Sequence, residues 1–559
     1  MNKKVLIVGG VAGGASTAAR LRRVDEAAEI ILFEKGQYIS FANCGLPYYI
    51  GGAIKDRKNL LVQTAQAMRA RFRIDVRELS EVVGIDRERK VVKVNSLKDG
   101  TTYEESYDIL VLSPGASAVK PPIPGIDSPN IYTLRDIPDT DSIKGFLDER
   151  KPQSAVVVGG GFIGLEMAEN LHNAGLKVDI VEALDQVMAP LDYDMAAIVH
   201  NHIRSKGCGL HLKDGVKAFE AEGEKTVVLL QSGKRIPADI VILSIGVKPN
   251  NMLAREAGLE IGVTGGIKVN EYLETSDPNI YALGDVIEVT DYVSGNPALI
   301  PLAGPANKQG RIVANNIAGR RETYKGTQGT AIAKVFDLAA ASTGINEKNL
   351  KKLGKEPGKD FISTITHSAS HAGYYPGGSL MAIKTIYTPE GKVLGAQIVG
   401  PDGVDKRIDY FAIAIRHGMT VHDLQEFELA YAPPFSSAKD PVNMAGYVGS
   451  NVLNGDIKVA YWNEAMNADT SNTFLLDVRE PSEFADGHIP NAVNIPLNQI
   501  RSRLDEIPKD KEVIANCRVG LRSYIGVRML VQNGFENVRN LSGGYITYSE
   551  VEKDMEANR

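Results

Sequence analysis

The three cysteines are the side chains best suited to redox or nucleophilic chemistry, and they lie far apart in the sequence. Cys44 stands in the segment S-F-A-N-C-G-L-P, Cys208 in K-G-C-G, and Cys517 at the start of C-R-V-G-L-R-S. No two are close enough to indicate a disulfide framework or a C-x-x-C pair. Each is either a small buried apolar residue or a reactive thiolate. The elements around each cysteine therefore decide which role it has.

A glycine-rich turn precedes Cys44 and predicts a dinucleotide site. Residues 5–8 form an apolar strand, G-G-V-A-G-G follows, a helix continues to about Arg23, and a strand over residues 30–33 ends at Glu34. The glycines permit a tight turn, the helix N-terminus takes a pyrophosphate, and the acid takes ribose hydroxyls. Val11 replaces the middle glycine of G-x-G-x-x-G, so a non-nucleotide α/β domain is an alternative. The predicted binding residues are Gly9, Gly10, Gly13, Gly14 and Glu34.

A second glycine turn follows the strand at residues 155–158 and carries the complete fingerprint G-G-G-F-I-G. The next strand ends at Glu182, and an acid at this position favours free ribose hydroxyls over a 2′-phosphate. NADH is therefore expected to be preferred, with NADPH possible. The predicted binding residues are Gly159, Gly161, Gly164 and Glu182.

A third motif, T-S-D-P-N-I-Y-A-L-G-D, ends at Gly284 and Asp285. Two further apolar strands, which close the nucleotide units, lead to Gly115 and Gly246. Together these five motifs resemble the two-dinucleotide flavoprotein disulfide reductases over about residues 1–445. The resemblance implies FAD and NADH as cofactors, with Asp285 at a ribityl hydroxyl of the flavin.

Cys44 has no neighbouring cysteine, so its oxidised form must be a sulfenic acid, a persulfide or a mixed disulfide. This indicates the single-cysteine branch of the family, which contains coenzyme A-disulfide reductases, NADH oxidases and peroxidases, and persulfide reductases. Peroxidase and oxidase members typically carry an Asn-His pair in the first glycine turn, where this chain has Val11-Ala12. The sulfur-reducing members are similar to this chain at G-G-V-A-G-G and S-F-A-N-C-G-L-P.

Two later segments, S-H-A-G-Y-Y-P-G and A-Y-A-P-P-F-S-S-A-K-D, resemble the dimerisation domain of coenzyme A-disulfide reductases. The resemblance implies a homodimer in which Tyr374 and Tyr431 reach across to the substrate sulfur. A phenol can donate a hydrogen bond to a departing thiolate. The alternative is that both tyrosines are only interface aromatics.

Ser16, Arg20 and Arg23 share one face of the first predicted helix. That face is either a solvated cationic surface or a site for an anionic substrate group. The resemblance implies coenzyme A, whose phosphates suit arginine. The family's basic position near residue 72 is Phe72 here, so Arg71 or Arg73 would substitute. The predicted substrate residues are Ser16, Arg20, Arg23, Ser40, Asn43, Arg71 and Lys439.

The segment from about Gly455 onward resembles a rhodanese domain over its whole length. Cys517 begins a loop that enters a helix, where backbone N–H groups and the helix dipole favour a thiolate. Related phosphatases have C-x5-R, whereas C-x4-R here forms a tighter cradle suited to one sulfane sulfur; a phosphatase is the alternative. Cys208 has no such setting and is expected to be structural. The other predicted loop residues are Arg518, Gly520, Arg522 and Ser523.

Composition narrows the function classes. The formal charge of −6 and the lack of a long basic run argue against nucleic acid. No apolar stretch approaches the ~20 residues of a membrane span, and the N-terminus is too weakly apolar for a signal peptide. We expect a cytoplasmic protein without a metal site.

The sequence thus predicts an α/β protein with two Rossmann-like dinucleotide-binding domains, an α+β dimerisation domain and an α/β rhodanese domain. The expected boundaries are 1–115 with 250–325 for FAD, 116–249 for NAD(P)H, 326–450 for dimerisation and 455–559 for rhodanese. The expected function is FAD-dependent reduction of coenzyme A disulfide, coenzyme A persulfide or polysulfide at Cys44, coupled to sulfur transfer. Two alternatives are an NADH oxidase or peroxidase that uses a Cys44 sulfenic acid, and a non-catalytic sulfane-sulfur carrier or redox sensor.

Overall fold

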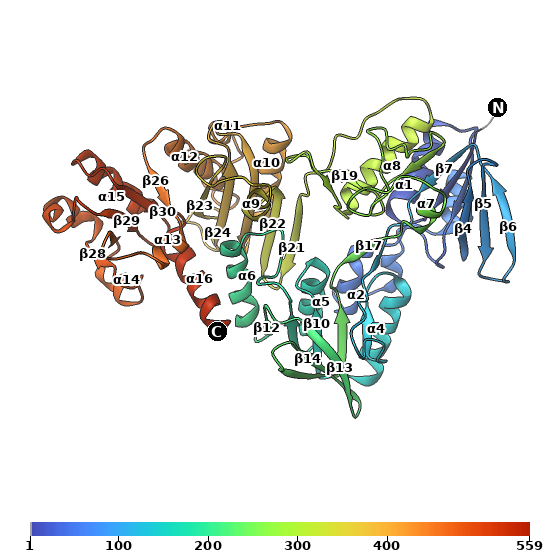
Figure 1. Ribbon diagram of the computed structural model, residues 1–559, viewed down its shortest axis with the longest axis horizontal. Helices are drawn as coiled ribbons and strands as arrows, with labels where there is room; N and C mark the ends of the chain where they lie inside the picture. The colour runs from blue at the N-terminus through green and yellow to red at the C-terminus, as the bar shows by residue number, and fades with distance from the viewer. Residues whose placement is uncertain (1–2) are drawn as a thin grey trace. The chain divides into compact units, whose positions relative to one another are not determined.

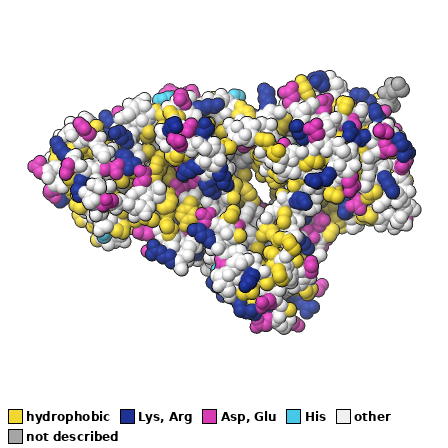
Figure 2. Space-filling model, viewed as in Figure 1, with side chains coloured by type: hydrophobic (Ala, Val, Ile, Leu, Met, Phe, Trp, Pro, Cys, Tyr) yellow, Lys and Arg dark blue, Asp and Glu magenta, His cyan; other side chains and the backbone are white. Residues whose placement is uncertain are grey.

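The computed structural model describes residues 3–559, which divide into two units (Figure 1). The first unit contains residues 3–181 and 214–329, and the second contains residues 182–213 and 330–559. Within residues 3–559, no helix is both long and apolar enough to cross a membrane. On the face shown in Figure 2, basic and acidic side chains are interspersed.

A parallel sheet with strand order β18-β7-β1-β2-β3 carries the first glycine turn. Val5 pairs with Ile30 on one side and with Ile109 on the other. These strands are continuous apolar runs because both of their faces are buried. The strands predicted at residues 5–8 and 30–33, and the strand predicted to lead to Gly115, are confirmed. The elements are β1 (Lys4–Val8), α1 (Ala12–Val24), β2 (Glu29–Phe33), β3 (Asp75–Arg77), β7 (Ile109–Leu112), β18 (Ile280–Ala282) and α8 (Ala303–Ile317).

The second glycine turn follows the middle of another parallel sheet, in which β11, β10, β16 and β9 are neighbours in that order. Val156 pairs with both Asp179 and Val241, so the turn after β10 opens at the carboxyl edge of the sheet. The elements are β9 (Ile131–Thr133), α4 (Ile137–Arg150), β10 (Ser154–Val158), α5 (Phe162–Asn173), β11 (Lys177–Val181) and β16 (Ile240–Leu243).

The remaining elements of the first unit are short helices around Cys44 and small antiparallel sheets. The helices are η1 (Asn43–Gly45), α2 (Leu46–Ile50), η2 (Arg57–Leu60), α3 (Ala65–Phe72) and α7 (Met252–Glu256). The strands are β4 (Ser80–Asp86), β5 (Val91–Ser96), β6 (Thr102–Ser106), β8 (Ala116–Ala118), β13 (Val216–Glu222), β14 (Lys225–Leu230), β15 (Arg235–Ala238), β17 (Val247–Pro249), β19 (Val289–Thr290) and β20 (Pro297–Ala298).

The second unit begins with an antiparallel sheet of order β21-β22-β25-β24-β23. Helices α10 and α6 pack against its strands β22 and β25. Its elements are α6 (Tyr193–Ser205), β12 (Gly209–His211), β21 (Ala331–Val335), β22 (Leu338–Gly344), α9 (Glu347–Lys352), β23 (Ile362–Ala369), β24 (Leu380–Tyr387), β25 (Val393–Gly400), α10 (Val404–Arg416), α11 (Val421–Glu426) and α12 (Pro441–Leu453).

The C-terminal part of the second unit is a parallel sheet of order β26-β30-β29-β27-β28, with Cys517 directly after the central strand β29. Its elements are β26 (Lys458–Ala460), α13 (Trp462–Met466), β27 (Thr473–Asp477), α14 (Pro481–Ala485), β28 (Val493–Asn494), η3 (Leu497–Ser502), η4 (Leu504–Glu506), β29 (Glu512–Asn516), α15 (Leu521–Gln532), β30 (Val538–Leu541) and α16 (Gly544–Ala557).

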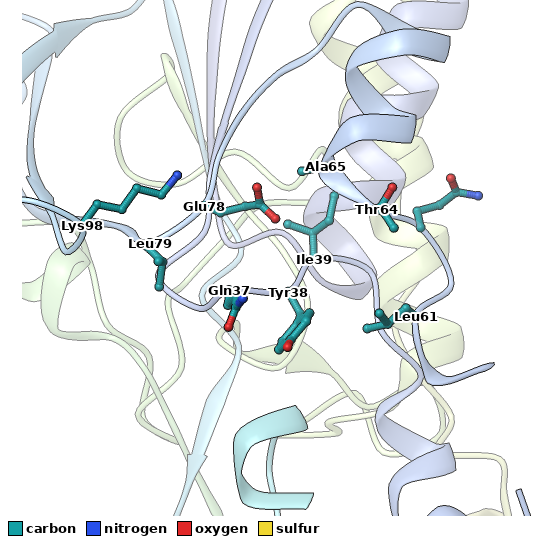
Figure 3. A pocket seen from close by; sticks show the side chains of 10 residues that line it. Gln37, Tyr38, Ile39, Leu61, Thr64, Ala65, Glu78, Leu79 and Lys98 are labelled. Atoms are coloured by element: carbon teal, nitrogen blue, oxygen red, sulfur yellow. The ribbon is translucent and has the colours of Figure 1, made fainter. Parts of the chain in front are cut away.

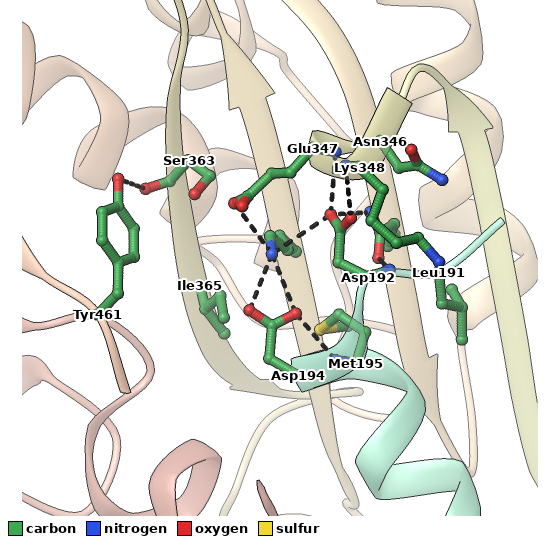
Figure 4. Close-up of polar contacts among 12 residues, drawn as sticks. Leu191, Asp192, Asp194, Met195, Asn346, Glu347, Lys348, Ser363, Ile365 and Tyr461 are labelled. Atoms are coloured by element: carbon green, nitrogen blue, oxygen red, sulfur yellow. Dashed lines mark hydrogen bonds and ion pairs between the residues drawn. The ribbon is translucent and has the colours of Figure 1, made fainter. Parts of the chain in front are cut away.

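A buried ion cluster holds α6 and α9 to the antiparallel sheet (Figure 4). The Lys384 ammonium on β24 lies 2.8 Å from Asp194, 3.3 Å from Asp192 and 3.0 Å from Glu347. Burial alone would lower the pKa of Lys384, but the three carboxylates raise it well above its usual value. The lysine therefore stays charged and neutralises acids from two different helical segments.

Replacing Lys384 with methionine is expected to destabilise the second unit by about 3–5 kcal/mol, because it leaves buried carboxylates without their cation. The midpoint of urea-induced unfolding measures this effect. Lys392→Met, at an exposed position before β25, is the matched control and should change stability by less than about 0.5 kcal/mol. An unchanged midpoint for Lys384→Met would show that the cluster does not stabilise the fold.

Candidate active site

The loop that carries Cys44 is fixed against the first glycine turn. The Ser40 N–H donates to the Gly10 carbonyl at 2.9 Å, and the Ser40 carbonyl accepts from the Val62 N–H at 3.0 Å. Ser40 has a φ of +45°, a left-handed conformation that residues other than glycine rarely adopt. These bonds hold the turn in that conformation and direct the following residues, including Cys44 in η1, along the dinucleotide domain.

Cys44 is where the dinucleotide motifs converge. The next helix, α2, packs against α5, and the Tyr48 hydroxyl donates to Glu166 Oε1 at 3.4 Å. The Cys44 side chain is exposed, yet partial burial and the charges of Glu166 and Asp285 raise the pKa of its thiol. Glu166 belongs to the helix of the second glycine turn and Asp285 to the Gly-Asp motif. One sulfur atom is thus within electrostatic reach of two separate cofactor motifs.

Glu166 is a site residue that the sequence analysis missed. Burial raises the pKa of its carboxyl group to about 7, although the hydrogen bond from Tyr48 opposes the shift. A group with this pKa can hold or release a proton near neutral pH. The signal in the sequence was an acid shortly after Gly164. Its position near Cys44 depends on the packing of α2 against α5, which the sequence does not reveal.

Both glycine turns have the geometry that a dinucleotide requires. Gly9 and Gly159 have φ values of +96° and +108°. A Cβ atom on Gly14 would lie 1.8 Å from the Gly9 carbonyl oxygen, and one on Gly164 would lie 1.9 Å from the Gly159 carbonyl oxygen. No side chain caps α1 or α5, and neither has an acid in its first turn. Their N–H groups can therefore take a pyrophosphate, and the chain fits two dinucleotides.

The predicted acidic residues lie at the ends of their strands. Glu34 follows β2 and accepts from the Gly10 and Gly36 N–H groups at 2.8 and 2.7 Å. Glu182 directly follows β11, and its carboxylate accepts from the Leu184 N–H at 2.9 Å. Burial raises the pKa of Asp285.

The closing glycines and Gly13 also adopt positions that suit glycine. Gly115, Gly246 and Gly284 have φ values of +67°, +116° and +81°, in the turns that follow their strands. A Cβ atom on Gly13 would lie 2.2 Å from the Leu283 side chain. Gly161 is the N-cap residue of α5. The assignment of all these residues to cofactor binding remains a prediction.

The predicted arginine face of α1 lies against α8, which adds residues that the sequence analysis did not include. The Ser16 hydroxyl donates to Asn307, and Arg20 Nε donates to Asn315 Oδ1 at 2.9 Å. Burial, together with the positive charges of Arg311, Arg320 and Arg23, lowers the pKa of Arg20. Mutually repelling guanidinium groups at one helix pair favour binding of a polyanion. Asn307 and Arg311 lie four residues apart on α8, but only the fold shows that this face meets α1.

The other predicted substrate residues of the first unit lie on neighbouring elements. Asn43 begins η1, directly before Cys44, and Arg71 is exposed near the end of α3. Arg22 ties this end of α3 to α1 by donating to the Phe72 carbonyl at 2.8 Å. Arg73, the substitute considered for the missing basic residue, is instead paired with Glu26 at 2.9 Å. Arg71 is therefore the better candidate.

Tyr374 and Tyr431 meet at the surface of the second unit. Their hydroxyl groups lie 2.6 Å apart, and the side chains are 75% and 47% exposed. The buried Arg407 joins the two loops by donating to the Ser370 carbonyl at 2.9 Å and by pairing with Asp440 at 2.9 Å. The two predicted catalytic tyrosines thus form one exposed pair. Lys439 is exposed beside Asp440 in the chain.

The Cys517 loop forms the expected cradle around its sulfur. Cys517 is fully buried, and its Sγ accepts from the Gly520 N–H at 3.1 Å and from the Ser523 hydroxyl at 3.5 Å. Helix α16 supports the loop from behind, because the Tyr545 N–H donates to the Cys517 carbonyl at 2.8 Å. Gly520 caps α15 with a φ of +102°. This geometry stabilises negative charge on the sulfur or on a sulfur atom attached to it.

Two further features include none of the predicted catalytic or binding residues. Cys208 is 4% exposed, as expected for a structural cysteine. A cavity of about 320 Å³ in the first unit lies around residues 37–39 (Figure 3). Its lining contains none of the residues predicted to bind a dinucleotide or coenzyme A. The candidate active site is therefore defined by the residues around Cys44 and not by this cavity.

Comparison with known families assigns most of the chain. Residues 3–310 match the pyridine nucleotide-disulphide oxidoreductase family, and residues 330–441 match the dimerisation domain of pyridine nucleotide-disulphide oxidoreductases. The chain belongs to the pyridine nucleotide-disulphide oxidoreductase family. This oxidoreductase uses FAD and NADH, and the predicted α/β fold class is confirmed. Residues 459–550 match the rhodanese-like domain.

Individual relatives are similar over nearly their whole length. The coenzyme A disulfide reductase of Staphylococcus haemolyticus is 38% identical over 447 residues, which cover 80% of this chain and 99% of that protein. The structure of reduced CoADR-RHD from Bacillus anthracis is 51% identical, with 99% of each chain covered and a TM-score of 0.96. An NAD-dependent persulfide reductase from A. fulgidus is 39% identical, with 98% of this chain and 100% of that chain covered and a TM-score of 0.91. The predicted resemblance is confirmed.

Proposed function

We propose that this oxidoreductase uses NADH to reduce the S–S bond of coenzyme A disulfide, coenzyme A persulfide or a polysulfide at Cys44, and that Cys517 carries sulfane sulfur. The observation that supports the first part best is the convergence of cofactor motifs at a cysteine without a partner. Within residues 3–559 no cysteine forms a disulfide, so we infer that an S–S bond at Cys44 is made with a substrate. The relatives named for disulfide and persulfide reduction support the same substrate class.

The chemistry at Cys44 is an S–S exchange. The Cys44 thiolate attacks one sulfur of the substrate, a bond forms between them, and the other sulfur leaves as a thiolate that takes a proton. When Cys44 returns to its thiolate, its S–S bond to the retained part of the substrate breaks and that part leaves as a second thiolate; a bound flavin would supply the two electrons, which come from NADH. The Glu166 carboxyl group, whose pKa is about 7 and which accepts a hydrogen bond from Tyr48, can take up or release a proton close to Cys44.

The tyrosine pair is assigned to the partner's active site. Tyr374 and Tyr431 are exposed on the part of the chain that matches a dimerisation domain. We therefore place them across a homodimer interface, where a hydroxyl donates to the departing thiolate. We also propose the predicted domain boundaries, which are 1–115 with 250–325 for FAD, 116–249 for NAD(P)H, 326–450 for dimerisation and 455–559 for rhodanese.

The steady-state rate of NADH oxidation tests the proposal. Coenzyme A disulfide, coenzyme A persulfide and inorganic polysulfide should each be reduced with a kcat/KM well above that for hydrogen peroxide. A protein that turns over peroxide much faster than every sulfur substrate would instead be a peroxidase. Turnover near zero with all four substrates would indicate a carrier or sensor.

Replacing Arg20 with alanine is expected to raise KM for coenzyme A disulfide about tenfold, because it removes a charge-assisted contact to a phosphate. The KM for inorganic polysulfide, which has no phosphate, should change by less than about twofold. Arg89→Ala removes an exposed arginine paired with Glu104 and serves as the matched control. Equal changes in both KM values for Arg20→Ala would contradict the assignment of the arginine face.

A further inference from the structure

Arg522, next to the Cys517 loop, is bonded to a carboxylate from another helix. Arg522 Nη1 donates to Glu483 Oε2 at 2.6 Å and Nη2 donates to Oε1 at 2.7 Å, a bidentate ion pair. The hydrogen bonds from Arg522 lower the pKa of Glu483 to about 2, so the carboxylate is charged at neutral pH. Glu483 is also fixed by its own helix, because the Glu480 N–H donates to Oε2 at 3.2 Å. Hydrogen bonds thus hold the Arg522–Glu483 ion pair in a defined geometry beside the loop.

The ion pair changes the charge that an incoming sulfur donor meets. Arg522 lies within electrostatic reach of the sulfur, since Glu483 and, to a smaller extent, Cys517 raise its pKa. Its bidentate face, which would suit a sulfonate or another oxyanion, is bonded to Glu483. Arg518 is exposed, and its guanidinium makes no hydrogen bond or ion pair within residues 3–559. Arg518, Arg522 and Glu483 together carry one net positive charge.

Two exposed apolar side chains lie on the helix that follows the loop. Leu521 and Ile525 lie four residues apart on α15, share a face, and are 56% and 39% exposed. A donor with an organic group can bury part of this surface, whereas a small inorganic anion cannot.

We propose that Glu483 makes Cys517 selective for sulfane sulfur carried on organic persulfides and disfavours thiosulfate, by occupying Arg522 and adding a negative charge at the loop. This inference rests on the proposed sulfur-carrying function of Cys517. With a persulfide, the Cys517 thiolate bonds to the outer sulfur, the S–S bond of the donor breaks, and one thiolate leaves. With thiosulfate the same step must expel the sulfite dianion. The Glu483 carboxylate, close to the loop, repels the two negative charges of the leaving sulfite more strongly than the single charge on the sulfur atom of a leaving thiolate.

The test uses the full chain carrying Cys44→Ser, so that the reductase site does not consume the donor. Quenched-flow mass spectrometry measures the rate constant with which Cys517 gains one sulfur atom from thiosulfate or from glutathione persulfide. Adding Glu483→Gln should raise the thiosulfate rate constant at least about tenfold and change the persulfide rate constant less than about twofold. Asp486→Asn, which removes an exposed carboxylate just after α14, should change neither.

A third substitution identifies the cause. Combining Arg522→Gln with Glu483→Gln should abolish the increase in the thiosulfate rate constant. That increase depends on the Arg522 guanidinium, which Glu483→Gln frees from its ion pair. An unchanged thiosulfate rate in Glu483→Gln, an equal change with both donors, or a gain that survives loss of Arg522 would overturn the selectivity. If neither donor loads Cys517 in the Cys44→Ser parent, the sulfur-carrying function fails, and the selectivity fails with it.

Discussion

Replacing Cys44 with serine is expected to lower NADH-dependent reduction of coenzyme A disulfide at least about a thousandfold, because serine cannot form the covalent sulfur intermediate. Hydride uptake from NADH should remain, since both glycine turns are unchanged. Stopped-flow absorbance separates the two effects by following bleaching of the bound flavin and then its recovery on adding the disulfide. The bleaching should occur normally and the recovery should be absent.

The matched control for this variant is Cys208→Ala. Cys208 is buried in the second unit and lies in none of the cofactor motifs. Its replacement should leave turnover within about twofold of the original, as for a position outside the catalytic machinery. Substantial reduction of coenzyme A disulfide by Cys44→Ser would remove Cys44 from the mechanism.

Replacing Cys517 with serine is expected to reduce sulfur loading of the C-terminal domain at least about a thousandfold, because the loop loses its nucleophile. Reduction of coenzyme A disulfide at Cys44 should stay within about twofold, since that substrate contains no sulfane sulfur for Cys517 to carry. Mass spectrometry of the protein after incubation with a persulfide and an NADH-oxidation assay measure the two activities on one preparation.

The Cys44→Ser protein provides the reciprocal control, because it should load Cys517 normally and fail in reduction. This crossed pattern distinguishes two separate sulfur sites from one shared site. A Cys517→Ser protein that loses coenzyme A disulfide reduction in proportion to sulfur loading would place Cys517 within the reductase cycle.

The dinucleotide and rhodanese folds could be predicted because their signals are local. The apolar strand at residues 5–8, the glycines after it and the acid at residue 34 lie close together in the sequence. Only glycine can follow the path seen at Gly9, where φ is +96° and a Cβ atom would lie 2.2 Å from the Ser113 carbonyl oxygen. Backbone requirements of this kind leave a direct record in the residue types.

The charged residues that change the electrostatics of Cys44, Arg20 and Arg522 could not be predicted, because they are distant from these residues in the sequence. Glu166 approaches Cys44 only through the packing of two helices, and Arg311 repels Arg20 only because α8 lies along α1. Glu483 is likewise far from Arg522 in the sequence, although both belong to the loop's ion pair. Charged side chains are common on surfaces, so their residue types alone carry no signal of such pairing.

If Cys44 breaks the S–S bond of a coenzyme A substrate, it must bond to one of the substrate's sulfur atoms. Peptide mass spectrometry after a single turnover detects this bond: NADH-reduced protein is mixed with limiting coenzyme A disulfide and quenched in acid. We expect coenzyme A attached to the Cys44 peptide, at a level that falls when excess NADH is added before the quench. Release of coenzyme A thiol without any adduct on Cys44 at any quench time would show that Cys44 does not bond to the substrate.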